Sequence, residues 1–169
     1  MLDKEIENYK ENGYCIIRGF ISKTAVRKLN TKINLFFKKE INKLKGKDVN
    51  FSNNKINSVH DIDKFDKYFK KFSKQKFIVN TVEKFLDSKA DFRKSEIFNK
   101  PAKHGLKSPM HQDNFYWCVK NNNALTIWVA LDYCNKKNGG LTYFRGSHKY
   151  GVVNHVDSFA PGSSQKIDT

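Results

Sequence analysis

Apolar residues in the first half of the chain recur at steps of three and four positions, the spacing of amphipathic helices. The pattern predicts helices over 3–12, 23–44, a stretch containing Phe65, Tyr68, Phe69 and Phe72, and 77–88. Between the first two helices, residues 14–20 are apolar and β-branched enough for a buried strand. Residues 46–57 are polar and predict a loop.

From about residue 90 the apolar positions alternate, which is typical of half-buried strands. The predicted strands are 92–99, 107–113, 115–119, 124–133, 141–145 and 152–155. Helices followed by a run of strands favour an α+β fold, with the helices packed on one face of an antiparallel sheet or sandwich. We expect one domain over 1–169, with a helical front over about 1–90 and a β part over about 91–169.

The composition agrees with a folded domain, because 169 residues can enclose one core and 14% are aromatic. Cys15, Cys118 and Cys134 form no C-x-x-C pair, so reduced, buried thiols are expected rather than disulfides or a zinc ribbon. The sequence shows neither a secretory signal nor an apolar run of the ~20 residues that cross a membrane. We therefore expect a cytoplasmic protein with no membrane partner.

The charge raises a nucleic-acid alternative, because a net charge of +15 attracts phosphate. Only four of the 32 basic residues are Arg, the side chain that favours bidentate phosphate contact. Residues 111–169 hold six of the basic residues, so most of the charge lies outside the chemistry described next. Solvated helix faces are the favoured interpretation of the lysines.

His111 and Asp113 are the candidate metal ligands. They are two residues apart at the end of a predicted strand, so both side chains point to one face and can reach one ion. An imidazole, a carboxylate and a second imidazole form the facial triad of non-haem Fe(II) oxygenases, which leaves positions open for O₂ and an oxo-acid. A structural histidine is the alternative, since this short motif also arises by chance.

Longer motifs surround this pair. They are Tyr9-Lys10-Glu11-Asn12-Gly13-Tyr14, Ile17-Arg18-Gly19-Phe20, Phe98-Asn99-Lys100-Pro101, His111-Gln112-Asp113 with Phe115-Tyr116-Trp117, Thr126-Ile127-Trp128-Val129-Ala130-Leu131-Asp132, Asn138-Gly139-Gly140-Leu141 and Gly146-Ser147-His148-Lys149. In order and spacing they resemble the phytanoyl-CoA dioxygenase family over essentially the whole chain.

The resemblance implies a double-stranded β-helix, or jelly roll, that uses Fe(II), 2-oxoglutarate and O₂ to hydroxylate a small organic metabolite. It implies that His111 and Asp113 are iron ligands and that Gln112 and Trp128 lie beside the cosubstrate. Lys100 and Glu96 match the strand that lines the cosubstrate pocket. A core position for Trp128 and surface positions for Lys100 and Glu96 are the alternatives.

The resemblance also implies a distal histidine ligand and an arginine that clamps 2-oxoglutarate. After Asp113 the sequence offers only His148, His155 and Arg145, with His155 the alternative third ligand. Residues 157–165 match the loop before the returning strands, so we expect a carboxy-terminally truncated member with uncovered apolar area. A non-catalytic jelly-roll remnant is the second hypothesis for this chain.

Overall fold

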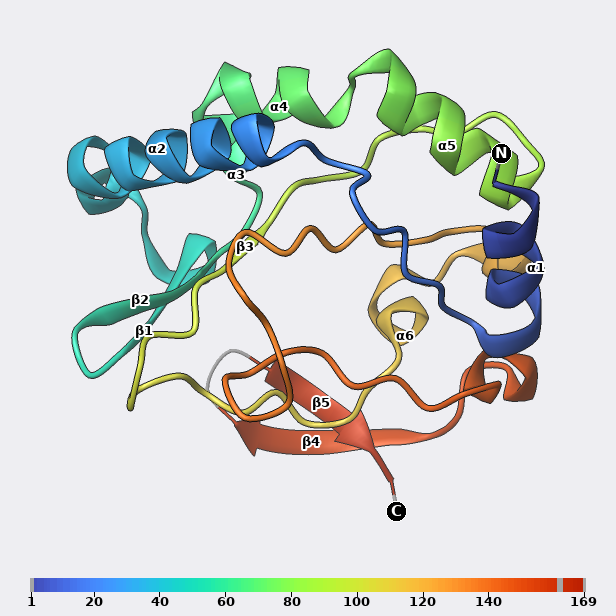
Figure 1. The fold of residues 1–169 in the computed structure, drawn as a ribbon. Coiled ribbons are helices and arrows are strands. Elements are labelled where there is room, and N and C mark those ends of the chain that lie inside the picture. Colours follow the sequence, from blue (N-terminus) through green and yellow to red (C-terminus); the bar gives the residue numbers. More distant parts are fainter. Residues whose placement is uncertain (1, 161–162, 169) are drawn as a thin grey trace.

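The computed structural model describes residues 2–160 and 163–168 and places a layer of helices over two small sheets (Figure 1). The helices are α1 (Asp3–Asn12), α2 (Lys23–Lys39), α3 (Ile62–Phe65), α4 (Lys67–Ser73), α5 (Lys76–Leu86) and α6 (Asp113–Trp117). The strands are β1 (Val49–Ser52), β2 (Lys55–Val59), β3 (Ile97–Phe98), β4 (His155–Ala160) and β5 (Ser163–Ile167). Four short 3-10 helices are η1 (Ile41–Lys43), η2 (Gly46–Asp48), η3 (Lys120–Asn122) and η4 (Ser147–Tyr150).

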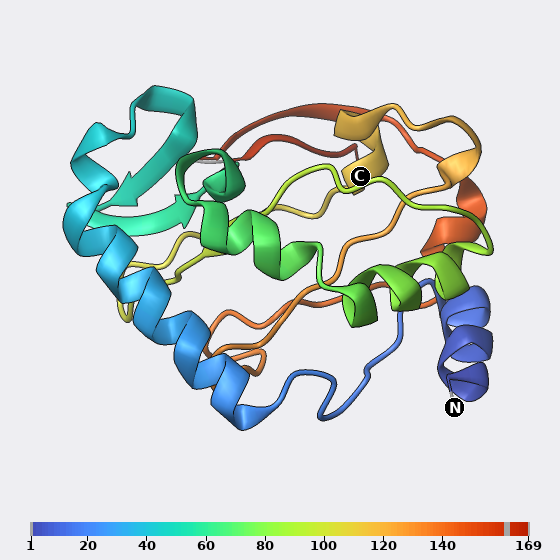
Figure 2. The same ribbon diagram turned by 90° about the horizontal axis from the view of Figure 1, so that it is seen from above.

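The helical layer follows the sequence periodicity closely. Figure 2 shows α2 running beside α4, and α1 next to the far end of α5, where the rings of Tyr9 and Phe85 meet edge-on at 5.3 Å. Helix α2 begins where Ser22 accepts a hydrogen bond from the Ala25 amide at 3.2 Å. It ends at Lys39, earlier than predicted. The predicted third helix is divided into α3 and α4 at Asp66, which caps α4 through the Tyr68 amide.

The core lies between α2, the β1–β2 hairpin and the short helices α3 and α4. Its buried members are Leu29, Ile33, Phe36, Leu44, Val49, Val59, Ile62 and Phe69. Phe36 is 2% exposed and meets Phe69 edge-on, with 6.1 Å between the ring centroids. The helical front and the hairpin therefore share one hydrophobic core.

The β1–β2 hairpin replaces the loop predicted over 46–57. Asn53 and Asn54 both have positive φ, at 48° and 58°, which is the conformation of a tight two-residue hairpin turn. Val49 and Val59 pair across the hairpin and are both buried. The loop prediction was wrong because the two asparagines mark a turn inside a hairpin whose ends reach the core.

The second half of the chain contains fewer strands than the alternation predicts. The predicted strand 92–99 is reduced to β3, which extends the hairpin sheet by pairing with β2. Residues 115–117 are helical in α6, so the strand predicted over 115–119 is wrong. No strand pairing is found over 14–20, 107–112, 124–133 or 141–145. Alternation fits an extended chain but does not supply the partner that a strand requires.

The last sheet is an antiparallel pair of β4 and β5, in which His155 lies opposite Ile167. The strand predicted over 152–155 begins only at its last residue, and most of the loop expected over 157–165 is strand. Residues 161–162 of that loop lie outside the described residues. The fold is thus mixed α and β with small antiparallel sheets, and the jelly roll stays a prediction.

Large apolar side chains are exposed along the irregular second half. They include Ile127, Trp128, Tyr133, Leu141, Tyr143, Phe144, Tyr150 and Phe159. Cys118 and Cys134 are also exposed and Cys15 is half-buried, so the expectation of buried thiols was wrong. Among the described residues, no helix has the length and apolar content needed to cross a membrane.

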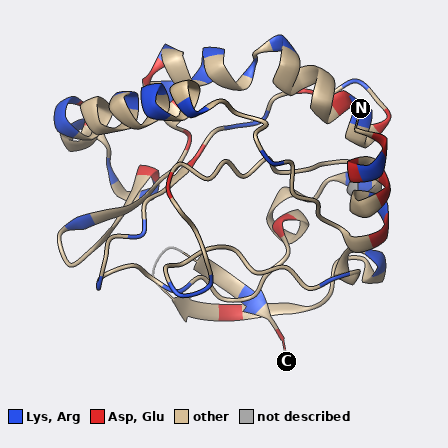
Figure 3. Ribbon diagram, viewed as in Figure 1, with Lys and Arg blue, Asp and Glu red and all other residues tan. Residues whose placement is uncertain are grey.

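The basic residues spread along α2, α4 and α5 and onto the β1–β2 hairpin, and within these elements the one acidic residue is Glu83 of α5 (Figure 3). Lysines distributed over several helices, and not gathered on one surface, are typical of solvated helix faces. Nucleic-acid binding stays a prediction.

Candidate metal centre

His111 and Asp113 lie at the start of α6, not on a strand as predicted. Asp113 is the first residue of the helix and Gln112 its N-cap. Despite this different backbone, His111 Nε2 and Asp113 Oδ1 are 3.4 Å apart. Gln112 between them has an extended backbone, with φ −112° and ψ 127°, so the two side chains reach one side of the chain as the strand argument predicted, although no strand is formed.

The remaining polar atoms of the two side chains have partners of their own. His111 Nδ1 donates to the Pro109 carbonyl at 2.8 Å, so Nε2 faces Asp113 and carries either a proton that it donates to the carboxylate or, once that proton is released, a lone pair for a metal ion. Asp113 Oδ2 accepts a hydrogen bond from the Thr126 hydroxyl at 3.0 Å. The Tyr116 ring lies edge-on to the imidazole, with 5.9 Å between centroids. Each side chain thus presents one donor atom to the space between them.

Electrostatics couple the two groups. The hydrogen bond from His111 lowers the pKa of Asp113, burial opposes this, and the Thr126 bond lowers the pKa further. The bond to Asp113 raises the pKa of His111, burial opposes this, and the Pro109 carbonyl adds to the rise. A divalent cation competes with that imidazole proton, so metal binding is expected to release a proton and to weaken as the pH falls.

The donor set fits a divalent metal in part. Imidazole nitrogen and carboxylate oxygen both suit Fe(II). Within the described part of the chain, however, no third His, Cys, Asp or Glu joins them in a group that could hold a metal ion. The residues present can hold such an ion by two ligands.

His155, the alternative third ligand, has both ring nitrogens engaged. Its Nε2 accepts the Gln112 backbone N–H at 3.0 Å, and its Nδ1 donates to the Val153 carbonyl at 2.8 Å. Its ring stacks on Phe115 at 4.2 Å between centroids. To bind a metal, His155 would have to give up the bond from Gln112. These contacts fit a histidine that holds the start of α6 in place.

Gln112 takes part in the same attachment through its side chain. Its Nε2 donates to the Gly151 carbonyl and its Oε1 accepts the Val153 amide, both at 2.8 Å. The Met110 carbonyl accepts the Ile167 amide of β5, also at 2.8 Å. The segment that carries the metal pair is therefore fastened to residues 151–155 and to the last strand.

The other two predicted cosubstrate residues lie apart from these bonds. Trp128 is 40% exposed, so it is not the buried core residue of the alternative interpretation. Lys100 runs against the turn at Gly139, where an added Cβ would lie 2.6 Å from Lys100 Cδ. This close approach explains why a glycine occupies position 139, because an added Cβ there would displace the Lys100 side chain.

Glu96 belongs to a half-buried hydrogen-bond network that the sequence did not reveal. Its Oε1 lies 2.5 Å from His60 Nδ1 and 2.8 Å from Lys94 Nζ. His60 Nε2 in turn lies within hydrogen-bond distance of Asn50 and of Ser58, which is 2% exposed. Burial raises the pKa of Glu96, but the hydrogen bonds from His60 and Lys94 outweigh it and lower the pKa overall.

Glu96→Gln tests this network through the pH dependence of stability. Because the pKa of Glu96 lies below its ordinary 4.5 in the fold, the carboxylate stabilises the protein above about pH 4.5. That contribution is lost as the pH falls through the lowered pKa. We expect the variant to have a lower free energy of unfolding than wild type at pH 7 and to converge with it once the pH has fallen below the lowered pKa. Urea unfolding across this range measures both effects.

The matched control is Glu7→Gln on the exposed face of α1, which should leave the pH profile of stability unchanged. Equal stability of Glu96→Gln and wild type at pH 7 would show that the network contributes nothing.

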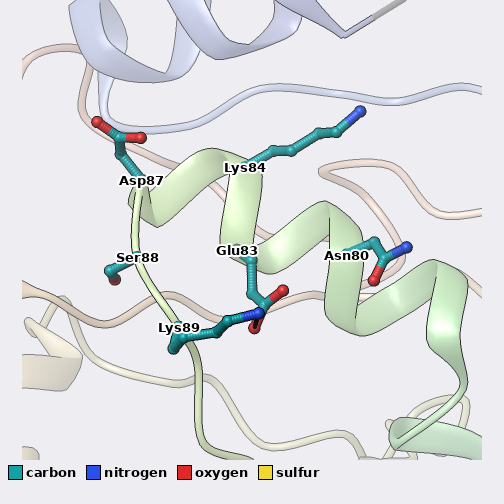
Figure 4. A pocket seen from close by; sticks show the side chains of 6 residues that line it. All are labelled: Asn80, Glu83, Lys84, Asp87, Ser88 and Lys89. Atoms are coloured by element: carbon teal, nitrogen blue, oxygen red, sulfur yellow. Dashed lines mark ion pairs between the residues drawn. The ribbon is translucent and has the colours of Figure 1, made fainter.

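Two surface hollows lie away from the metal pair. One, of about 470 Å³, is formed by the end of α5 and the turn after it, with a Glu83–Lys89 ion pair of 3.5 Å at its centre (Figure 4). The other, of about 620 Å³, lies between α1, α5, η3 and η4. Neither is lined by His111 or Asp113, so neither adds a ligand to the candidate metal centre.

His111 and Asp113 thus lie side by side in a mixed α and β fold with small antiparallel sheets. Residues 9–167 match the family model "Phytanoyl-CoA dioxygenase (PhyH)". The chain therefore belongs to the phytanoyl-CoA dioxygenase family, as the sequence motifs predicted.

Individual relatives agree with this assignment. "Phytanoyl-CoA dioxygenase, peroxisomal" of Bos taurus is 24% identical over 161 residues, covering 87% of this chain and 48% of the relative. "Phytanoyl-CoA dioxygenase 1" of Oryza sativa subsp. japonica is 34% identical over 102 residues, or 57% and 35% of the two chains. A Stutzerimonas stutzeri protein named "Probable alpha-ketoglutarate-dependent hypophosphite dioxygenase" is 33% identical over 78 residues, or 46% and 27%. The chain spans about half the length of the peroxisomal relative.

Proposed function

We propose that the whole protein is an Fe(II)- and 2-oxoglutarate-dependent dioxygenase that hydroxylates a small organic metabolite with O₂. His111 and Asp113 are two of its iron ligands. The observation that carries the proposal is the 3.4 Å approach of Nε2 and Oδ1, in side chains whose other polar atoms are already bonded. Relatives named dioxygenases, one of them alpha-ketoglutarate-dependent, support the same chemistry.

Bound Fe(II) supplies the oxidation chemistry, using the oxidative decarboxylation of 2-oxoglutarate. The chain's own residues hold and orient the ion: His111 through Nε2 and Asp113 through Oδ1. Half-exposed Trp128 walls the cosubstrate side, as its family position suggests. Gln112 holds the start of α6 in place through its hydrogen bonds to Gly151 and Val153. Lys100 packs against the turn at Gly139.

Lys94 is a cation near the site that can attract an anionic cosubstrate. It is one of the charges that lower the pKa of Asp113, and Glu96 holds its ammonium group. The adjacent Arg93 lies over the Trp117 ring of α6 at 5.8 Å, which places this segment beside the helix. We assign Lys94 a role in attracting the cosubstrate, in addition to the arginine clamp expected from the family.

We propose that the distal histidine and the arginine clamp implied by the family lie outside the residues described, in the returning strands of a jelly roll. The reading frame beyond the Thr169 codon tests this directly: a histidine followed about ten residues later by an arginine supports the enzyme. No third His, Cys, Asp or Glu of the described residues joins the pair in a group that could hold a metal ion, which favours the rival hypothesis, a non-catalytic remnant.

Anaerobic addition of Fe(II) and 2-oxoglutarate to protein made from the complete reading frame tests the proposed activity. We expect a metal-to-ligand charge-transfer band in the visible region, and its loss in the Asp113→Ala variant. A wild-type protein that binds Fe(II) but gives no such band would overturn the proposal. A cytoplasmic location stays a prediction, since the peroxisomal names belong to the relatives.

A further inference from the structure

We propose that Thr126 is a positioning residue that selects which oxygen of Asp113 faces the metal. This inference rests on the proposed function. The Thr126 hydroxyl donates to Asp113 Oδ2 at 3.0 Å, while Asp113 Oδ1 faces His111 Nε2 at 3.4 Å. The two carboxylate oxygens are chemically equivalent until one of them is bonded, so this hydrogen bond distinguishes the ligand oxygen from the other.

Apart from its 3.4 Å contact with His111 Nε2, the carboxylate is held by the shorter hydrogen bond from Thr126. Asp113 is 48% exposed at its side chain and begins a helix of only five residues. Rotation about its terminal torsion angle would exchange the two oxygens at little cost, because this torsion has a broad energy profile. A hydroxyl donor on Oδ2 removes that freedom and leaves Oδ1 turned toward the imidazole.

Threonine suits this role by its covalent structure. Its β-branched side chain has restricted χ1 rotamers, so its hydroxyl direction is better defined than that of serine. The Thr126 bond has a counterpart at the other ligand, where the Pro109 carbonyl accepts from His111 Nδ1 at 2.8 Å. In each side chain, the polar atom that does not face the metal makes a hydrogen bond that orients the one that does. Such bonds commonly support metal ligands in proteins.

The segment that carries Thr126 is itself attached to the helical layer. Asn30 of α2 donates to the Leu131 carbonyl at 3.0 Å, and Asn123 donates to Ser88 after α5 at 3.3 Å. These bonds hold the segment on both sides of Thr126. The hydroxyl therefore connects the Asp113 carboxylate to the best-packed part of the fold.

Mn(II) affinity of the purified chain tests the proposal without requiring enzyme activity, with water-proton relaxation as the readout. Thr126→Val keeps the side-chain shape and removes the donor, and we expect about tenfold weaker Mn(II) binding, the lower end for loss of a ligand's partner. Thr126→Ser restores the donor and should bind within about twofold of wild type. Thr81→Val is the matched control, because it removes a hydroxyl bond to the Phe77 carbonyl within α5 and should leave Mn(II) binding unchanged.

Wild-type affinity in Thr126→Val would overturn the positioning role, as would equal losses in the Val and Ser variants. If Thr126→Val does not fold, Thr126→Ala compared with Thr126→Ser gives the same decision. The His111→Ala and Asp113→Ala variants test the proposed metal centre separately. If they bind Mn(II) like wild type, the metal pair itself is wrong, whatever Thr126 does.

Discussion

Asp113→Ala is expected to weaken Mn(II) binding by more than about 100-fold, beyond the 10- to 100-fold typical of losing a ligand's hydrogen-bond partner. The substitution removes the only carboxylate of the pair and leaves one imidazole, which cannot hold a divalent ion well alone. Asp113→Asn should lose nearly as much, because an amide oxygen keeps the shape but not the charge. Water-proton relaxation with Mn(II) measures all three proteins.

The control is Asp91→Ala, an exposed carboxylate in the segment before β3, which should leave Mn(II) affinity unchanged. It shows that any loss in Asp113→Ala comes from the site and not from a lower total negative charge. Unchanged affinity in Asp113→Ala would reduce the 3.4 Å contact to an ordinary surface ion pair.

Phe36→Ala is expected to lower the free energy of unfolding by about 3–5 kcal/mol. Phe36 is a residue of α2 that is 2% exposed, and its ring packs against Phe69 of α4. Its removal leaves a cavity at the point where the helical layer meets the hairpin. A loss of this size is a large share of the roughly 5–15 kcal/mol that stabilises a typical domain. Urea unfolding followed by far-ultraviolet circular dichroism measures it.

The adjacent Leu35 supplies the matched control, because it lies on the same helix but is 43% exposed. Leu35→Ala should lower the free energy of unfolding by less than about 1 kcal/mol, because the Leu35 side chain is already partly in water and its removal leaves no enclosed cavity. Similar losses in the two variants would mean that α2 does not bury the face that contains Phe36.

The helices were predictable because their signal is local. Residues 3–12 and 77–88 show the three- and four-residue apolar steps, and α1 and α5 follow them within one or two residues. The predicted helix over 23–44 extended too far because Ile41 and Leu44 continue the apolar pattern. Both still contact the core, but from η1 and the residues after it. Burial was predicted correctly there, and backbone conformation was not.

The strands were poorly predictable because pairing is not a local property. The apolar and polar positions of residues 124–133 alternate as in many real strands, yet within the described residues no strand pairs with them. The hairpin over 49–59 does have paired strands, but the sequence did not predict it. Its asparagine turn and its polar residues indicate a loop, although Val49 and Val59 at its ends are buried. Sequence periodicity reports which side chains can be buried, but not where a second strand lies.

The proximity of His111 and Asp113 was predictable from their spacing, although the helix that begins at Asp113 was not, and their role as metal ligands stays a prediction. His111 and Asp113 meet across Gln112, whose extended backbone brings the two side chains to one side as in a strand, before α6 begins at Asp113. Thr126 belongs to one of the motifs that resemble the family, but the sequence did not predict its hydrogen bond to Asp113, which lies 13 residues earlier at the start of α6. The His60–Glu96 contact could be inferred only from the β2–β3 register, which periodicity does not contain.

The bonds that Gln112 makes to Gly151 and Val153 also bear on the order of folding. They join residues about 40 positions apart in sequence, so the chain must close a long loop before the start of α6 is held. Contacts of this separation form slowly compared with helices. The individual helices are therefore expected to form before the start of α6 is held, so that binding of a divalent ion to a refolding sample reports a late step of folding.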